Sequence, residues 1–191
     1  MSIILGLADT DNAIIMSDGR VTRHKTGEII GENCNKTHRF NEYVIVGYSG
    51  IKDVSECVIQ EMMNLCRENI KTLNADEVTN NLCLISQQVV ESMSISVPAQ
   101  MVIAGVDGSR KMTLNVFSKS QNFNISKYVP EPKGLSYVSL DPDSLTEKNM
   151  YRQFLADERF PVETRMRNYI KYVASIDETV NDTIFELSVK R

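Results

Sequence analysis

The sequence predicts an α+β fold, because its predicted strands and helices occur in separate blocks along the chain. Apolar runs at 2–8 and 12–19 are bounded by Asp and Asn residues, which is typical of two strands joined by a tight turn. Helical periodicity begins at 52–70 and continues at 74–93, and strands return only after these two helices. If helices cover both faces of a strand sandwich, the layers run α, β, β, α.

The first two predicted strands have nearly continuous apolar sequences instead of alternating ones. This pattern is typical of strands that are covered on both faces. A second pair of strands is predicted at 36–41 and 42–50, with Asn41 and Glu42 at the turn between them. Four strands therefore precede the first helix.

The first two helices are predicted from apolar residues at spacings of three and four. In 52–70 these positions hold Val54, Cys57, Val58, Met62, Leu65 and Cys66. The helix at 74–93 has its own stripe, made of Val78, Leu82, Ile85, Val89 and Met93. It starts with Asn74 as the predicted N-cap and Glu77 three residues later, which indicates a capping box.

The second half of the chain returns to strands, then adds two helices and a last strand. A hairpin is predicted at 99–119 around the turn sequence DGSR, and a further strand at 133–141. Helices are predicted at 142–157 and 161–176, and a strand at 183–191 completes the order.

The composition limits the classes of partner. No repeat or linker interrupts the 191 residues, so we expect one domain, 1–191, with a substantial core. The 25 acidic and 21 basic residues give a formal net charge of -4, which argues against general nucleic-acid binding. No apolar run approaches the ~18 residues that cross a membrane. With no secretory signal either, we expect a cytoplasmic protein without a membrane partner.

Metal ions and cofactors are not expected. The four cysteines, Cys34, Cys57, Cys66 and Cys83, form no Cys-x-x-Cys pair and match no zinc spacing. The two histidines are too few for a histidine-rich metal site and lie in polar contexts, at His24 and His38.

Several short segments carry candidate functional residues. Ser2 begins the first strand, and Asp18 follows sixteen residues later in the segment MSDGRVT. Lys36 lies in NKTHRF, at the start of the third predicted strand. The segment VGYSGIKD before the first helix contains Ser49 and Gly50. The segment SIDET near the end contains Asp177.

These segments, in this order, resemble the proteasome β-subunit and HslV-like family of N-terminal nucleophile hydrolases. The resemblance implies the four-layer αββα sandwich and a threonine/serine-type peptidase that hydrolyses amide bonds. It also implies self-assembly into homo-oligomeric rings, a peptide or unfolded protein as substrate, and an ATP-dependent unfoldase as partner. The chain itself contains no nucleotide-binding motif.

The resemblance implies a catalytic role for each of the quoted residues. Ser2 would be the nucleophile once Met1 is removed, and its own α-amine, with an ordinary pKa of about 7.7–8.0, would take the hydroxyl proton. Lys36 would keep that amine neutral by like-charge repulsion, and Asp18 would hold Lys36 in place. The backbone N–H groups at Ser49 and Gly50 would stabilise an oxyanion.

The remaining family positions are less well matched. Asp177 would support the nucleophile, but the family carries a serine or threonine three residues after this aspartate, and Val180 stands there. The Ser-Gly-Ser segment of the family is represented only by Ser139. Val21, Gly47 and Ile51 match positions of the specificity pocket, which predicts a preference for small apolar side chains.

Other interpretations remain open at the level of sequence. Taken singly, Asp18 fits a turn, Lys36 a surface lysine, Ser49 and Gly50 an ordinary start of a helix, and Asp177 a turn cap. A non-catalytic scaffold or assembly protein would have the same fold, and so would a non-peptidase amidase, because fold does not fix substrate.

Overall fold

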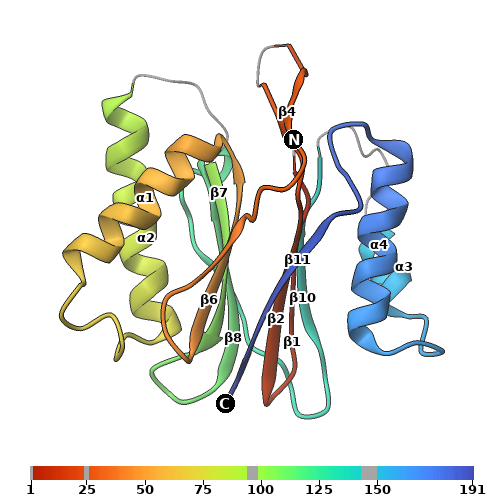
Figure 1. Ribbon diagram of the computed structural model, residues 1–191. Helices are drawn as coiled ribbons and strands as arrows, with labels where there is room; N and C mark the ends of the chain where they lie inside the picture. The colour runs from red at the N-terminus through yellow and green to blue at the C-terminus, as the bar shows by residue number, and fades with distance from the viewer. Residues whose placement is uncertain (1, 24–25, 94–98, 143–149) are drawn as a thin grey trace.

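The protein has four layers, two β-sheets in the middle and a pair of helices on each outer side (Figure 1). The computed structural model describes residues 2–23, 26–93, 99–142 and 150–191. The outer layers are α1 (Lys52–Leu65) with α2 (Ala75–Ser92), and α3 (Met150–Leu155) with α4 (Val162–Ile176). This architecture confirms the predicted α+β fold with layers in the order α, β, β, α.

Both sheets are antiparallel. The four-stranded sheet has the order β10 (Ser136–Leu140), β1 (Ile4–Ala8), β2 (Asn12–Asp18) and β11 (Ile184–Lys190). The five-stranded sheet has the order β5 (Thr37–Arg39), β6 (Val44–Gly50), β7 (Ala99–Val106), β8 (Met112–Ser118) and β9 (Ser126–Tyr128). A short 3-10 turn, η1 (Lys119–Gln121), lies between β8 and β9.

Strand alternation explains why the first strands are apolar on both faces. In β1, Leu5 and Leu7 belong to the cluster that packs against α3 and α4, whereas Ile4 belongs to the cluster between the sheets. β6 alternates in the same way, because Val46 packs with α1 and α2 while Ile45 lies between the sheets. Each central strand therefore contributes to two cores.

The capping box predicted at the start of α2 is present. The Asn74 side chain accepts hydrogen bonds from the backbone N–H groups of Asp76 (3.0 Å) and Glu77 (3.2 Å). The Glu77 carboxylate accepts one from the backbone N–H of Asn74 (2.9 Å). These bonds satisfy donors that the first turn of a helix leaves unpaired, and they fix where α2 begins.

The structure differs from the sequence-based prediction at the end of α1 and in short strands that were not predicted, and one predicted segment is not tested. α1 ends at Leu65 instead of residue 70, and the chain continues in turns in which the Thr72 N–H donates to Asn69 O. A hairpin of β3 (Val21–Thr22) and β4 (Ile29–Gly31) and the short strand β9 were not predicted. The first part of the helix predicted at 142–157 lies at 143–149, outside the described residues.

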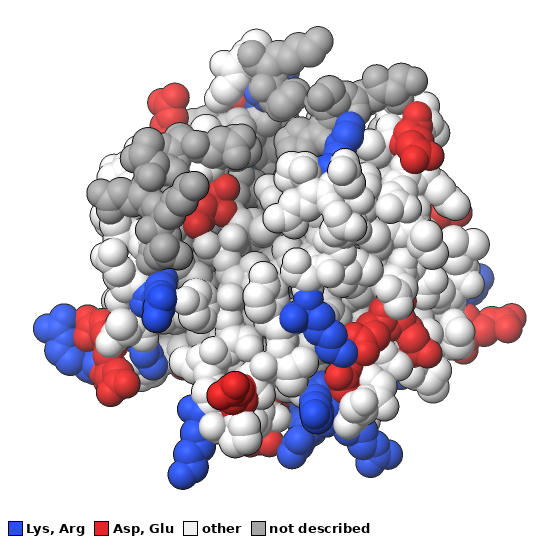
Figure 2. Space-filling view, turned by 180° about the vertical axis from the view of Figure 1, so that it is seen from behind, with Lys and Arg blue, Asp and Glu red and all other residues white. Residues whose placement is uncertain are grey.

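The surface seen from behind carries charges of both signs. On this face, the coloured acidic and basic residues lie interspersed and mainly along the lower part, instead of forming a basic stripe (Figure 2). Within residues 2–23, 26–93, 99–142 and 150–191, no helix has the length and apolar character needed to cross a membrane.

Candidate active site

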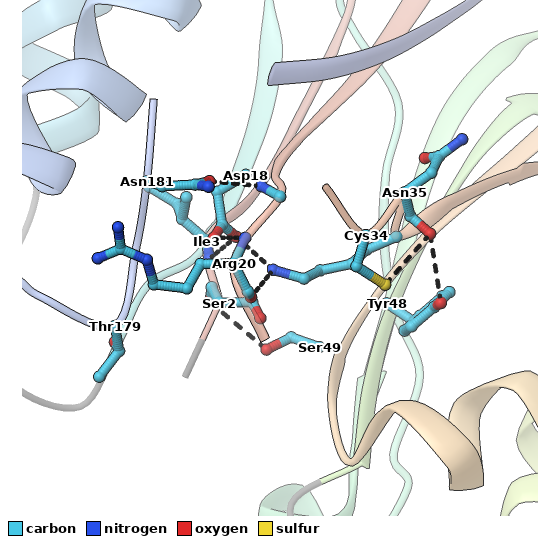
Figure 3. Close-up of polar contacts among 12 residues, drawn as sticks. Ser2, Ile3, Asp18, Arg20, Cys34, Asn35, Tyr48, Ser49, Thr179 and Asn181 are labelled. Carbon is cyan, nitrogen blue, oxygen red and sulfur yellow. Dashed lines mark hydrogen bonds and ion pairs between the residues drawn. The ribbon is translucent and has the colours of Figure 1, made fainter. Parts of the chain in front are cut away.

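The start of β1 opens into a pocket of about 1030 Å³. Ser2, Lys36, Ser49 and Gly50 line this pocket, together with residues of the β3–β4 hairpin and the first turn of α1. Ser2 is 8% exposed, and its carbonyl oxygen accepts a hydrogen bond from the Ser49 hydroxyl (3.5 Å; Figure 3). The fold thus places the beginning of the chain against the end of β6, in the opposite sheet.

Asp18 and Lys36 form a buried ion pair beside Ser2. The Lys36 ammonium lies 2.7 Å from Asp18 Oδ1, and the two side chains are 4% and 0% exposed. Asp18 Oδ1 also accepts the backbone N–H of Ile3 (3.1 Å), the residue that follows Ser2. Lys36 is therefore directed toward the start of the chain and is not a surface lysine.

Burial and mutual attraction act in opposite directions on this pair. Burial raises the pKa of Asp18 and lowers the pKa of Lys36, because each charged form loses its hydration. The attraction between Asp18 and Lys36 opposes both shifts. Lys36 also donates a hydrogen bond to the carbonyl oxygen of Arg20 (2.7 Å), which fixes its head group from a second side.

The end of β6 and the start of α1 form the wall that faces Ser2. Gly50 has φ of 117°, a conformation that favours glycine, and it lets the chain turn directly from the strand into the helix. Among the described residues, no side chain caps the first turn of α1, whose residues Ile51, Lys52 and Asp53 line the pocket. Helix N-termini expose backbone N–H donors, so this wall suits a developing oxyanion.

Asp177 lies directly after α4 and is 8% exposed, and one of its carboxylate oxygens is bonded to Thr179. Asp177 Oδ1 accepts hydrogen bonds from the backbone N–H of Thr179 (2.7 Å) and from its hydroxyl (2.6 Å). Thr179 itself lines the pocket. Ser139 donates its hydroxyl to Asp141 (2.6 Å), which also accepts the hydroxyl of Tyr169 (2.9 Å). The structure thus ties Asp177 to Thr179 and Ser139 to Asp141.

The predicted specificity residues are only partly at the pocket. Val21 and Ile51 line it, but Gly47 does not, because its position on β6 faces the other sheet. The neighbouring Tyr48 and the free thiol of Cys34 line the pocket instead. The preference for small apolar side chains stays a prediction, with Tyr48 and Cys34 in the lining in place of Gly47.

We expect that Gly47→Ala will destabilise the protein without reshaping the pocket. A Cβ at Gly47 would lie 2.7 Å from the Cγ2 atoms of both Ile4 and Ile15. Overpacking of this kind costs about 1–3 kcal/mol, which urea unfolding followed by circular dichroism can measure. An unfolding free energy equal to that of the wild type would contradict the placement of Gly47 between the sheets.

Sequence reasoning missed a group of polar side chains behind Asp18. Arg20 and Asn181 both donate hydrogen bonds to the Glu32 carboxylate, and Figure 3 shows Arg20 and Asn181 beside Asp18. Glu32 lies 149 residues before Asn181 in the chain, so no local pattern joins them. The only sequence signal is that Arg20 lies two residues after Asp18.

Comparison with known proteins finds similarity in three dimensions only. No protein-family model and no curated protein matches the sequence. The crystal structure of eukaryotic HslV from Trypanosoma brucei covers 99% of both chains, with a TM-score of 0.65 and 15% identity. The Anbu complex from Pseudomonas aeruginosa, described as a helical assembly, has a TM-score of 0.73 and 13% identity over 99% of this chain and 81% of that chain. The chain therefore has the same four-layer fold as HslV and the Anbu protein.

Proposed function

We propose that this protein is an N-terminal serine hydrolase that cleaves amide bonds of peptides after removal of Met1. The observation that carries the proposal is the buried Lys36 ammonium, held by Asp18 beside the start of β1. A buried charge pair costs desolvation free energy, and replacing it with apolar residues is often neutral or stabilising. Its presence at this position therefore favours a catalytic role over a purely structural one.

In the proposed reaction the Ser2 hydroxyl oxygen attacks the carbonyl carbon of the substrate. The free α-amine of Ser2 takes the hydroxyl proton and later gives it to the departing amine. The N–H groups of Gly50 and the first turn of α1 stabilise the oxyanion. The Ser49 N–H instead faces β7, because the Tyr48 N–H before it donates to Lys36 O on the β5 side. The resulting ester is hydrolysed by water, which restores the hydroxyl and releases the acid. Asp18 and Lys36 form no bond to the substrate in this scheme. Their role is to keep the Ser2 amine neutral.

Self-assembly is the second part of the proposal. The Anbu complex is described as a helical assembly, and the resemblance in sequence implies a ring. In a ring and in a helical assembly, one surface of each chain binds a different surface of the next chain. Both assemblies therefore need a head-to-tail contact. Light scattering of the purified protein tests this part, because a mass equal to one 21.6 kDa chain would contradict it.

An ATP-dependent unfoldase is the partner that the resemblance implies.

A non-catalytic assembly protein is the alternative that one observation favours. The family supports the nucleophile with the aspartate that matches Asp177 and with a hydroxyl three residues later. Val180 provides no hydroxyl at the position where the family has one. A scaffold would retain the fold and assemble, but it would not react at Ser2.

Acylation by a peptide β-lactone separates these two functions. Ring opening by Ser2 adds the whole probe as an ester, so intact mass and peptide mapping identify the acylated residue. We expect acylation of Ser2 in the protein that lacks Met1 and none in Ser2→Ala. Because the thiol of Cys34 lines the same pocket, Cys34→Ala is the matched control and should still be acylated. A wild-type protein without Met1 that stays unmodified would falsify the hydrolase proposal.

A further inference from the structure

Three segments around the pocket are tied together by Arg20, Glu32 and Asn181. Arg20 follows β2, Glu32 follows β4, and Asn181 lies between α4 and β11. The Arg20 guanidinium donates two parallel hydrogen bonds to the Glu32 carboxylate, Nε to Oε2 (3.0 Å) and Nη2 to Oε1 (3.1 Å). Its Nη1 donates a third bond to the carbonyl oxygen of Glu178 (2.5 Å). One side chain thus joins the hairpin to the loop after α4.

The Asn181 side chain also bonds to this group, through both its amide nitrogen and its amide oxygen. Its Nδ2 donates to the Glu32 carbonyl oxygen (2.8 Å) and to Glu32 Oε2 (2.6 Å). Its Oδ1 accepts the backbone N–H of Gly19 (2.8 Å). A Cβ at Gly19 would lie 2.7 Å from the Glu32 carbonyl oxygen, so the segments pack closely there. Asn181 is 7% exposed, whereas the Glu32 side chain is 46% exposed, so only the Asn181 end of the group is shielded from water.

The same segment contacts the ion pair through its backbone. Gly19 and Arg20 directly follow Asp18, and the Arg20 N–H donates to Asp18 Oδ2 (2.9 Å). The Arg20 carbonyl oxygen is the second acceptor of the Lys36 ammonium. A shift of Arg20 would therefore displace an acceptor that fixes Lys36.

We propose that Arg20, Glu32 and Asn181 form a clamp, which positions Lys36 and fixes the β3–β4 hairpin relative to the loop after α4. This inference rests on the proposed hydrolase function. Single exposed ion pairs contribute little stability, but paired Arg–carboxylate bonds within a network are stronger and geometrically specific. The bond from Arg20 is the main reason that the pKa of Glu32 is lowered. The three residues are positioning residues, because they act through Lys36 and do not touch the reacting atoms.

The clamp is tested with Glu32→Gln, which removes the charge, and Asn181→Ala, which removes the bond to Gly19. The matched control is Glu28→Gln, because Glu28 forms an exposed ion pair with Arg23 at 3.4 Å on the same hairpin. For each variant that retains the wild-type circular dichroism spectrum, lactone acylation of Ser2 gives a maximal rate and a half-saturating concentration. Hydrogen exchange of the Gly19 amide reports the Asn181 bond independently of catalysis.

We expect the maximal rate to fall about tenfold in both clamp variants, because small displacements of catalytic groups are costly. The half-saturating concentration should stay near the wild-type value, Gly19 should exchange faster in Asn181→Ala, and Glu28→Gln should match the wild type. Maximal acylation rates equal to the wild-type rate overturn the clamp, whether or not the Gly19 amide exchanges faster. A change in the half-saturating concentration alone also overturns it. A wild-type protein that is not acylated overturns the proposed function, and the catalytic role of the clamp with it. A reactive wild type with equally reactive variants overturns the clamp alone.

Discussion

Lys36→Ala is expected to lower the acylation rate at pH 7 by at least about a hundredfold, in the range that proton-transfer catalysis provides. The same change leaves the Asp18 carboxylate buried without its cation, and breaking a buried pair in this way costs about 3–5 kcal/mol. Burial already raises the pKa of Asp18, and Lys36 opposes that shift. The loss of stability should therefore shrink as the pH falls and Asp18 becomes protonated. Urea unfolding of the wild type and of Lys36→Ala at acidic and neutral pH measures this difference.

The double variant Asp18→Asn with Lys36→Met separates the catalytic role of the pair from its structural role. It removes both charges of the buried pair, so it should regain part of the stability that Lys36→Ala loses. The recovery is partial because the new amide has one acceptor oxygen in place of two, whereas Ile3 and Arg20 each donate a backbone N–H to a different oxygen of Asp18. Its acylation rate should remain as low as that of Lys36→Ala. A double variant with the wild-type rate would show that the pair only supports the fold.

The features that the sequence predicted correctly are set by local patterns or by distance from the start of the chain. The capping box at Asn74 needs only Glu77, three residues away, so the start of α2 could be predicted. Asp18 could be placed near Ser2 because two adjacent antiparallel strands, joined by a tight turn, return the chain to the level at which it began. Lys36 was assigned to the site only because its segment resembles the family motif. Its local sequence alone fits a surface residue.

The features that the sequence did not predict depend on long-range packing. Alternation along β6 shows that Gly47 and Tyr48 face opposite sides, but it does not show which side holds the pocket. β3 has two residues and β4 has three, so the hairpin is too short to show the apolar alternation that marks a strand. Glu32 and Asn181 meet only because β11 returns beside β2, which no pattern near either residue indicates.

Activity should depend on a free amine at Ser2, so a removable leader placed directly before Ser2 should abolish it. With the leader present, the nitrogen of Ser2 is a peptide amide that cannot accept the hydroxyl proton, and β-lactone acylation should be undetectable. Cleavage of the leader directly before Ser2 should restore the rate without any change in sequence beyond that point. The control is the same cleavage applied to Ser2→Ala, which should remain unmodified.

The pKa of the Ser2 amine tests the role of Lys36 independently of turnover. A neighbouring ammonium disfavours the protonated amine, so its pKa should lie below the ordinary value of about 7.7–8.0. The acylation rate should therefore rise with pH and level off earlier than an isolated amine would allow. Labelling of the amine with an anhydride across a pH series measures this pKa directly, even in inactive variants. In the Asp18→Asn, Lys36→Met double variant the value should return to the ordinary range, and a value unchanged from the wild type would mean that Lys36 does not act on the amine.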